Sequence, residues 1–287
     1  MKICSLITRH ISQKDLYVFA RKIGYLGYIL AGRHRHIAFD GLIQAFGKGK
    51  DRFQIKQIVK DCFIFIAKSS TELLFTLDRP YFVRNNFEII GREIIDKALA
   101  KGKGVILVSA HFGNFPLILV RLSLQGYKTS VIMRPMKDKR IEELFEPERA
   151  KLDIDTIYSI PRKRCVESAI RSLRNNRLLF IPLDQNFGTA GVYVDFFGRK
   201  AATATGPVVL ARRTGAVILP CFIIRQKDDS HKIIFEDVLE LGKGKTDTET
   251  ILINIQKLTD IIESYIRRYP AEWSWIHRRW KSRPKQI

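Results

Sequence analysis

The stretch that decides the fold is Val105-Ile106-Leu107-Val108-Ser109-Ala110-His111-Phe112-Gly113-Asn114-Phe115-Pro116. Its first four residues form an apolar run that predicts a buried strand. The chain leaves this strand at Ser109 to His111, and Asn114 can cap a helix that begins at Phe115. A histidine at a strand-to-helix turn is well placed for proton transfer, and such a base usually has a carboxylate that fixes its tautomer. His111 is therefore a candidate catalytic base, against the alternative of an ordinary core or loop histidine.

Outward from this stretch, strands alternate with helices. Strands are expected at residues 87–90, 105–109, 129–133, 156–160, 178–183, 217–224 and 232–235, the last at a sheet edge. Helices are expected at residues 93–100, 115–125, 140–151, 166–175, 205–213 and 250–269. This alternation predicts an α/β fold with a mostly parallel central sheet flanked by helices. Ligands of such sheets bind beyond the carboxyl ends of the strands, where His111, Arg134 and Asp184 should lie at one rim.

Residues 1–80 read as a helical segment, and residues 81–287 as one compact α/β unit. Apolar residues recur at helical spacings over 53–77, and Arg79-Pro80 should end that helix. The segment Leu16 to Leu30 contains Arg21 and Lys22 and is too short to span a membrane. It fits either an amphipathic helix in the membrane interface or a helix packed on its own domain.

The charge balance favours anionic partners. The chain has 287 residues, with 50 Lys and Arg against 29 Asp and Glu, for a net charge of +21. Nucleic acid, an acidic carrier protein and an anionic membrane would all suit this field, but no nucleic-acid-binding module is recognisable. The four cysteines form no CxxC pair, so we expect free thiols and no metal site.

Three further clusters each allow more than one interpretation. Asp184-Gln185-Asn186 follows an apolar strand, and these residues can orient His111, hold a hydroxyl acceptor or simply build a turn. Residues 191–200 form either a loop that walls an acyl chain, with Arg199 meeting a phosphate, or an ordinary hairpin. Residues 273–283 mix all three tryptophans with cations, which suits a lipid headgroup interface, nucleic acid or a docked C-terminal tail.

Taken together, the segments resemble the bacterial lipid A biosynthesis acyltransferases, the lauroyl and myristoyl transferase family of the lysophospholipid acyltransferase superfamily. The blocks that carry the resemblance are Arg35-His36-Ile37-Ala38, Ser109 to Asn114, Met133-Arg134-Pro135, Asp184-Gln185 with Phe196-Phe197-Gly198 and Thr205-Gly206-Pro207, and Trp273 to Lys281. Each block alone is weak, but their occurrence in the right order over nearly the whole chain is a strong signal.

The resemblance implies an O-acyltransferase that moves a fatty acyl group from an acyl thioester to a hydroxyl of a lipid A precursor or other glycolipid or lysophospholipid. The donor would be acyl carrier protein or CoA, a substrate rather than a cofactor, and no metal would be used. His111 would be the general base, Arg134 and more weakly Arg199 would bind phosphate, and Gly113 and Asn114 would shape the oxyanion region. The protein would work in lipopolysaccharide biosynthesis as a peripheral or monotopic protein on the cytoplasmic face of the inner membrane.

Pro116 is a departure from the family pattern, which has glutamate or aspartate five residues after the histidine. Proline is harmless to the helix, because its first turn tolerates a missing N–H. Three readings follow for the chemistry: Asp184 supplies the acid, His111 works unaided with a rate loss on the order of 10²–10⁴, or the protein binds lipid or acyl carrier without catalysis. We expect a working acyltransferase, with the catalytically impaired relative as the alternative.

Overall fold

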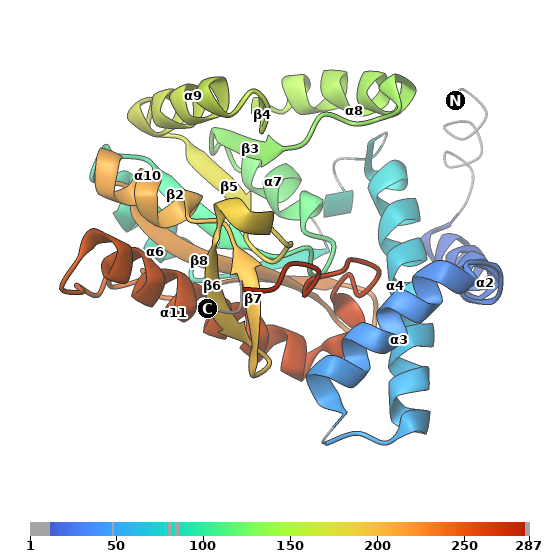
Figure 1. Ribbon diagram of the computed structural model, residues 1–287. Coiled ribbons are helices and arrows are strands. Elements are labelled where there is room, and N and C mark those ends of the chain that lie inside the picture. The colour runs from blue at the N-terminus through green and yellow to red at the C-terminus, as the bar shows by residue number, and fades with distance from the viewer. Residues whose placement is uncertain (1–11, 48, 78, 80–81, 84–85, 285–287) are drawn as a thin grey trace.

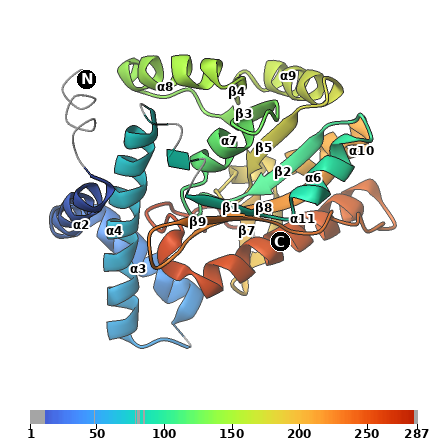
Figure 2. The same ribbon diagram turned by 180° about the vertical axis from the view of Figure 1, so that it is seen from behind.

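The computed structural model describes residues 12–284 except 48, 78, 80–81 and 84–85. The expected boundary between residues 80 and 81 lies outside these described residues. The N-terminal part is helical, with α2 (Gln13–Leu30), α3 (Gly32–Phe46) and α4 (Arg52–Leu77). These helices lie together at one side of the sheet, which Figures 1 and 2 show from opposite directions.

The α/β fold with a mostly parallel sheet is confirmed. Its strands are β1 (Phe87–Ile90), β2 (Val105–Ser109), β3 (Thr129–Met133), β4 (Ile154–Tyr158), β5 (Leu178–Pro182), β8 (Val217–Arg225) and β9 (His231–Phe235). The sheet order is β1-β9-β8-β2-β5-β3-β4, and the β8–β9 pair is antiparallel while the other pairs are parallel. The prediction that residues 232–235 form an edge strand is wrong, because β1 pairs with β9 and covers its outer side.

Helices cover both faces of the sheet. They are α6 (Arg92–Leu99), α7 (Pro116–Ser123), α8 (Lys139–Lys151), α9 (Arg162–Arg174), α10 (Gly206–Thr214) and α11 (Asp247–Arg268). Val105 and Leu107 of β2 pack in one core with α6 and α7, whereas Ile106 and Val108 pack in a second core with α9, α10 and α11. This alternation follows from the two-residue period of a strand and explains why the first four residues of β2, 105–108, are all apolar.

Residues 191–200 belong to a hairpin rather than a loop. β6 (Val192–Phe196) and β7 (Arg199–Thr203) form a separate antiparallel pair after the short 3₁₀ helix Gly188–Ala190. The hairpin lies over α11 on the side of the sheet seen in Figure 1. Phe196 and Phe197 are buried in the core there, so these aromatic side chains serve packing.

Candidate functional site

The site begins where β2 and β5 end side by side. The two strands are parallel neighbours, and Ser109 is paired with Pro182 at their last residues. Two residues beyond each of these lie His111 and Asp184, and His111 Nδ1 is 2.8 Å from Asp184 Oδ1. Parallel pairing therefore brings an imidazole and a carboxylate together from positions 73 residues apart. A base and its orienting acid are the pair that proton transfer from a hydroxyl requires.

Asp184 is a buried carboxylate with both oxygens bonded. Its side chain is 3% exposed, and Oδ2 accepts a hydrogen bond of 2.7 Å from the indole N–H of Trp273. Burial alone would raise the pKa of Asp184, but the charge and hydrogen bond of His111, with the bond from Trp273, lower it to about 2. Asp184 is therefore ionised and fixed in orientation at any physiological pH.

His111 is oriented as a base by the same contact. Burial acts to lower the pKa of His111, and attraction and hydrogen bonding by Asp184 outweigh this and raise it. With its Nδ1–H donated to Asp184, the neutral ring has a lone pair on Nε2. The side-chain nitrogen of Gln185 lies 3.2 Å from Nε2 and can donate to it.

The C-terminal segment forms one wall of the site. Phe112 and Trp273 form an antiparallel bridge, flanked by hydrogen bonds from Gly113 N to Glu272 O (2.9 Å) and from Ser274 N to His111 O (3.1 Å). Trp273 and Trp275 are each only 1% exposed. Of the three interpretations of residues 273–283, the docked tail is the one the structure shows.

The same segment fixes the loop that follows Asp184. Arg279, 1% exposed, donates to the carbonyls of Gln185 (3.2 Å) and Ala202 (2.6 Å). His277 Nε2 accepts a 3.1 Å bond from the backbone N–H of Asn186. Burial lowers the pKa of His277, so the ring is neutral and its nitrogen can accept. Arginine and histidine thus hold the carbonyl and the N–H of the same peptide group, between Gln185 and Asn186.

Asn114 does not cap the helix that follows it, contrary to prediction. Helix α7 begins at Pro116, and its cap residue Phe115 makes no side-chain cap bond. The Asn114 side chain instead donates to the carbonyl of Ser69 (3.1 Å) and to Glu72 Oε2 (2.8 Å), both on α4. A buried amide must satisfy its hydrogen bonds, and the carboxylate of Glu72 is the stronger acceptor. Asn114 therefore fastens the site to the N-terminal helices.

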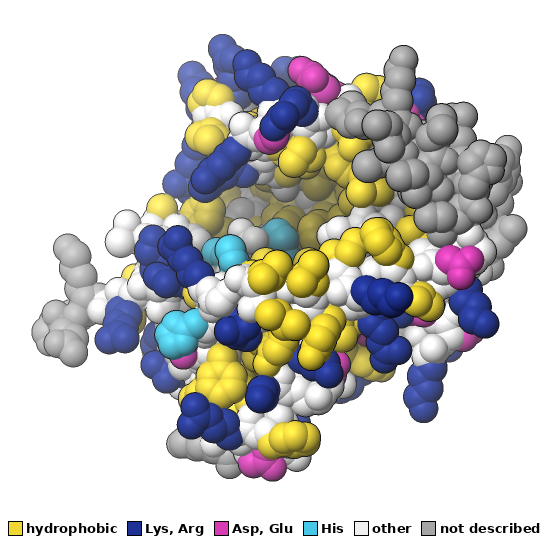
Figure 3. All heavy atoms as spheres, turned by 90° about the vertical axis from the view of Figure 1, so that its right-hand side faces the viewer, with side chains coloured by type: hydrophobic (Ala, Val, Ile, Leu, Met, Phe, Trp, Pro, Cys, Tyr) yellow, Lys and Arg dark blue, Asp and Glu magenta, His cyan; other side chains and the backbone are white. Residues whose placement is uncertain are grey.

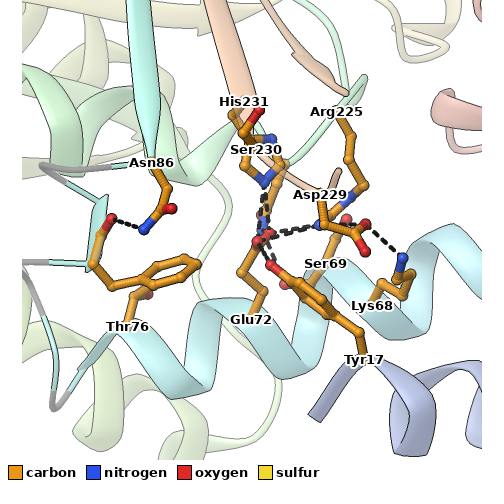
Figure 4. A network of polar contacts seen from close by, with 12 residues as sticks. Tyr17, Lys68, Ser69, Glu72, Thr76, Asn86, Arg225, Asp229, Ser230 and His231 are labelled. Atoms are coloured by element: carbon orange, nitrogen blue, oxygen red, sulfur yellow. Dashed lines mark hydrogen bonds and ion pairs between the residues drawn. The ribbon is translucent and has the colours of Figure 1, made fainter. Parts of the chain in front are cut away.

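Glu72 is the centre of a buried polar network, shown in Figure 4. Its carboxylate is fully buried and contacts Arg225 Nη2 (2.6 Å), His231 Nε2 (3.0 Å) and the hydroxyl of Tyr17. Burial would raise the pKa of Glu72, but the hydrogen bond and charge of His231 and the charge of Arg225 lower it to about 2. The network joins α2 and α4 to β8 and β9, so the N-terminal helices are bound to the sheet by a paired charge.

A cavity of about 190 Å³ opens beside His111. Its lining is Phe65, Ile66, Ser69, Ser70, Leu73, His111, Gly113, Asn114, Phe115, Pro116, Glu272 and Ser274. Figure 3 shows this side of the molecule hollowed, with hydrophobic side chains inside the hollow and Lys and Arg along its left and upper left edge. The cavity is smaller than the roughly 300–1,000 Å³ of a pocket for a drug-sized ligand, so it suits the reacting end of a larger molecule.

The remaining predicted residues lie at different distances from the cavity. Gly113 lines it with a φ of +61°, and a Cβ there would meet the carbonyl oxygen of Ile223 at 2.0 Å, so only glycine fits. Arg134 is exposed at the carboxyl end of β3, the strand beyond β5 at the same rim. Arg199 is the first residue of β7, at the turn of the hairpin. The other end of β7 is Thr203, which Arg279 contacts, and the strand between the two residues is about 13 Å long. The structure does not bring Arg199 to the His111 cavity.

Three contributors to the site were not predicted as such from the sequence. The sequence shows Trp273 as part of an aromatic-basic tail, but its hydrogen bond to Asp184 spans 89 residues and no local pattern indicates it. Glu272 is the residue before Trp273. Glu72 lies within an apolar helix, and an acidic residue in such a sequence is a recognisable sign of a buried, paired carboxylate. Within the described ranges, no group of three or more His, Cys, Asp or Glu side chains could hold a metal ion.

The chain is similar to proteins of a known family. Residues 14–282 match the family described as bacterial lipid A biosynthesis acyltransferase. The chain is 28% identical over 204 residues to a lipid A biosynthesis lauroyltransferase of Escherichia coli, covering 70% of this chain and 63% of the relative. It is 27% identical over 193 residues to a phosphatidylinositol mannoside acyltransferase of Mycobacterium tuberculosis, covering 66% of this chain and 58% of the relative. The matched regions thus span less than two thirds of these relatives.

Among solved structures, a 1-acyl-sn-glycerophosphate acyltransferase, PlsC, from Thermotoga maritima covers 88% of this chain and 97% of its own. Its TM-score of 0.41 and identity of 11% are too low to support an argument about function. The family match extends over nearly the whole chain and includes His111, Asp184 and the C-terminal wall. The chain therefore belongs to the bacterial lipid A biosynthesis acyltransferase family.

Proposed function

We propose that this protein is an O-acyltransferase that moves a fatty acyl group from an acyl thioester to a hydroxyl of a glycolipid, such as a lipid A precursor. The observation that carries the proposal is the 2.8 Å contact between His111 and Asp184, at the strand ends of a chain of this family. Asp184 supplies the carboxylate that the family motif has at the position of Pro116. One named relative is a lauroyltransferase of lipid A biosynthesis and the other a phosphatidylinositol mannoside acyltransferase, and lipid A and phosphatidylinositol mannoside are both glycolipids.

The chemistry follows from the orientation of His111. Nε2 takes the proton of the acceptor hydroxyl while Asp184 stabilises the positive charge that forms on the ring. The hydroxyl oxygen attacks the thioester carbonyl carbon, the carbon–sulfur bond breaks, and the departing thiolate takes the proton back from His111. The cavity beside His111 receives the reacting end of a substrate whose remaining part lies outside it.

The direct test is acyl transfer by the purified protein. Acyl carrier protein thioester and acyl-CoA are supplied as alternative donors, with a lipid A precursor, a phosphatidylinositol mannoside and a lysophospholipid as alternative acceptors. We expect transfer to at least one acceptor and loss of about 10²–10⁴ in rate for His111→Ala. Equal rates for wild type and His111→Ala with every pair of substrates would contradict the proposal.

Pro116 favours one alternative, a relative that binds lipid or acyl carrier without transferring the acyl group. The acyl-transfer rate of Pro116→Glu distinguishes the two functions. An intact His111–Asp184 pair needs no further acid, so we expect the rate of the variant to stay within about tenfold of wild type. A gain of 10² or more would mean that Pro116 impairs the site and would favour the alternative.

An acidic carrier protein is the donor that the surface charge supports best. A cavity of about 450 Å³ at the start of α9 is lined by Arg162, Lys163, Glu167 and Arg213 around Val166 and Ile170. Arg162 also lies over the ring of Phe187, in the segment that follows Asp184, so this basic region adjoins the site. Cations around an apolar floor complement an acidic amphipathic helix.

The membrane surface is the expected location of the acceptor. In the described part of the chain, no helix has both the length and the apolar character needed to cross a bilayer. Helix α2 packs one face on α4 and exposes apolar side chains on the other, including Phe19 (55%), Leu26 (54%) and Ile29 (49%). Exposed apolar residues among cations suit a helix that lies in an anionic interface. We propose peripheral attachment to the cytoplasmic face of the inner membrane.

A further inference from the structure

Glu272 lies in the His111 cavity on a defined backbone register. In the bridge between Phe112 and Trp273, residues 111 and 274 lie opposite each other, and so do residues 113 and 272. Phe112 and Trp273 point together into the core, where they are 0% and 1% exposed. His111, Glu272 and Ser274 flank this isolated bridge, and all three line the cavity.

The spacing between His111 and Glu272 leaves room for a reacting group. The two residues are diagonal neighbours across the bridge, a relation that in a sheet separates residues by about 7–8 Å, with the β-carbons somewhat closer. Both side chains are long enough to reach an atom bound between them. Among the described residues that line this cavity, Glu272 is the carboxylic acid, while position 116 is proline.

The Glu272 carboxyl group is held in place and is mostly neutral. Its Oε2 accepts a 3.3 Å hydrogen bond from the backbone N–H of Arg225, and its main-chain carbonyl accepts from Gly113. The guanidinium of Arg225 is turned to Glu72, which binds it through both oxygens. Burial raises the pKa of Glu272 to about 8 against the opposing bond and charge of Arg225, so the group carries a proton at pH 7.

We infer that Glu272 is a further catalytic residue of the proposed acyl transfer, in which its carboxyl O–H donates a hydrogen bond to the carbonyl oxygen of the acyl thioester. The inference rests on the proposed function. The backbone N–H of Gly113, one donor expected for this oxygen, is already bonded to the carbonyl of Glu272. A protonated carboxyl in an apolar cavity can supply the missing donor.

The step balances without any further reactant. As the acceptor oxygen bonds to the thioester carbon, its proton passes to His111 Nε2 and the carbonyl electron pair moves onto oxygen. Glu272 stabilises this oxyanion and keeps its own proton. The carbonyl re-forms as the carbon–sulfur bond breaks, and the thiolate takes the proton from His111. In thioester hydrolysis, water replaces the acceptor and the same oxyanion forms.

Two substitutions separate the hydrogen bond from the shape of the side chain. Glu272→Met removes the donor at similar volume, and Glu272→Gln keeps a donor in its amide group. We expect Glu272→Met to lower kcat by about 10²–10³, both for transfer and for hydrolysis of the acyl thioester without acceptor. Glu272→Gln should retain both rates within about tenfold. Glu240→Met, at an exposed surface position, is the matched control.

Three results would overturn the inference: full activity of Glu272→Met, equal loss in the Gln and Met variants, or loss of transfer with unchanged hydrolysis. The last would place Glu272 on the acceptor instead. If Glu272→Met does not fold, Glu272→Asp is used instead, because it keeps the carboxyl group but moves it away from the thioester by the length of one methylene. Unchanged rates for Glu272→Asp would also overturn the inference. An inactive wild type would count against the proposed function, whereas an active wild type with unaffected variants counts against Glu272 alone.

Discussion

At the scale of single residues, the site depends on a carboxylate and a base that the sequence places far apart. His111 has a carboxylate partner in Asp184, because β2 and β5 are neighbours and end at the same level. The burial of Asp184 matters as much as its distance, since a carboxylate that water cannot reach acts on His111 with little screening. Pro116 therefore removes an acid from the motif without leaving the histidine unpartnered.

In the proposed acyl transfer, the raised pKa of His111 would set the pH dependence of the rate. His111 must be neutral to act as a base, so activity rises as pH passes upward through its pKa. We expect the acidic limb of kcat/KM to have its midpoint above 6.5, the ordinary value for histidine. In Asp184→Asn the attraction is lost while burial remains, and the midpoint should move below that of wild type. A midpoint that is the same in both proteins would show that Asp184 does not act on His111.

We expect Trp273 to affect the rate of acyl transfer through its hydrogen bond to Asp184, and not through packing alone. Trp273→Phe keeps a buried ring but removes the N–H that donates to Asp184 Oδ2. A hydrogen bond to a charged group contributes about 1.5–3 kcal/mol, so kcat should fall roughly tenfold or more. Trp275→Phe is the control, because its N–H bonds to the carbonyl of Pro270 instead. Equal kcat values for the two variants would contradict this role.

At the scale of elements, the sequence predicts local pieces well and their long-range partners poorly. The apolar run at Val105 and the helical spacing of α4 both predict their elements within a few residues. The sequence predicts Asn114 as a helix cap, because no local pattern shows that its amide donates to Glu72 on α4. The pairing of β1 with β9 is likewise non-local, so the sequence predicts β9 as an edge strand although β1 lies outside it. The rim shared by His111 and Asp184 was predictable because parallel topology follows from alternation.

The Glu72 network should be required for stability as well as for position. Arg225→Met removes the guanidinium that pairs with a fully buried carboxylate and leaves Glu72 with His231, Tyr17 and Asn114 as partners. The free energy of unfolding should fall by about 3–5 kcal/mol, measured by chemical denaturation. Arg212→Met, which breaks the exposed pair with Asp247, should change it by no more than about 1 kcal/mol. Similar losses for the two variants would show that burial of the pair is not decisive.

At the scale of the whole molecule, the His111 cavity lies between the sheet and the N-terminal helices. Residues of α4 and of the His111 turn line it together, so α4 both shapes the cavity and packs against the helix with the exposed apolar side chains. The net charge of +21 adds long-range attraction to anionic lipid and to an acidic carrier. This arrangement places the reacting groups near the surface on which the proposed acceptor lies.

Attachment through α2 can be tested with vesicles of mixed neutral and anionic phospholipid. The triple variant Phe19→Ser, Leu26→Ser, Ile29→Ser should lose most binding, because it removes exposed apolar area that the fold itself does not use. Leu241→Ser with Leu252→Ser alters exposed residues elsewhere and should bind like wild type. Binding should also weaken with salt. Undiminished binding of the triple variant in a sedimentation assay would place the contact on another surface.

The central claim is that Asp184 provides the acid for His111 in acyl transfer. The most direct measurement is the kcat of Asp184→Asn, a substitution that keeps the shape of the side chain and removes its charge. We expect kcat to fall by about 10³–10⁴, with the melting temperature close to that of wild type. A kcat within about threefold of wild type would show that His111 works without Asp184, and would contradict the claim.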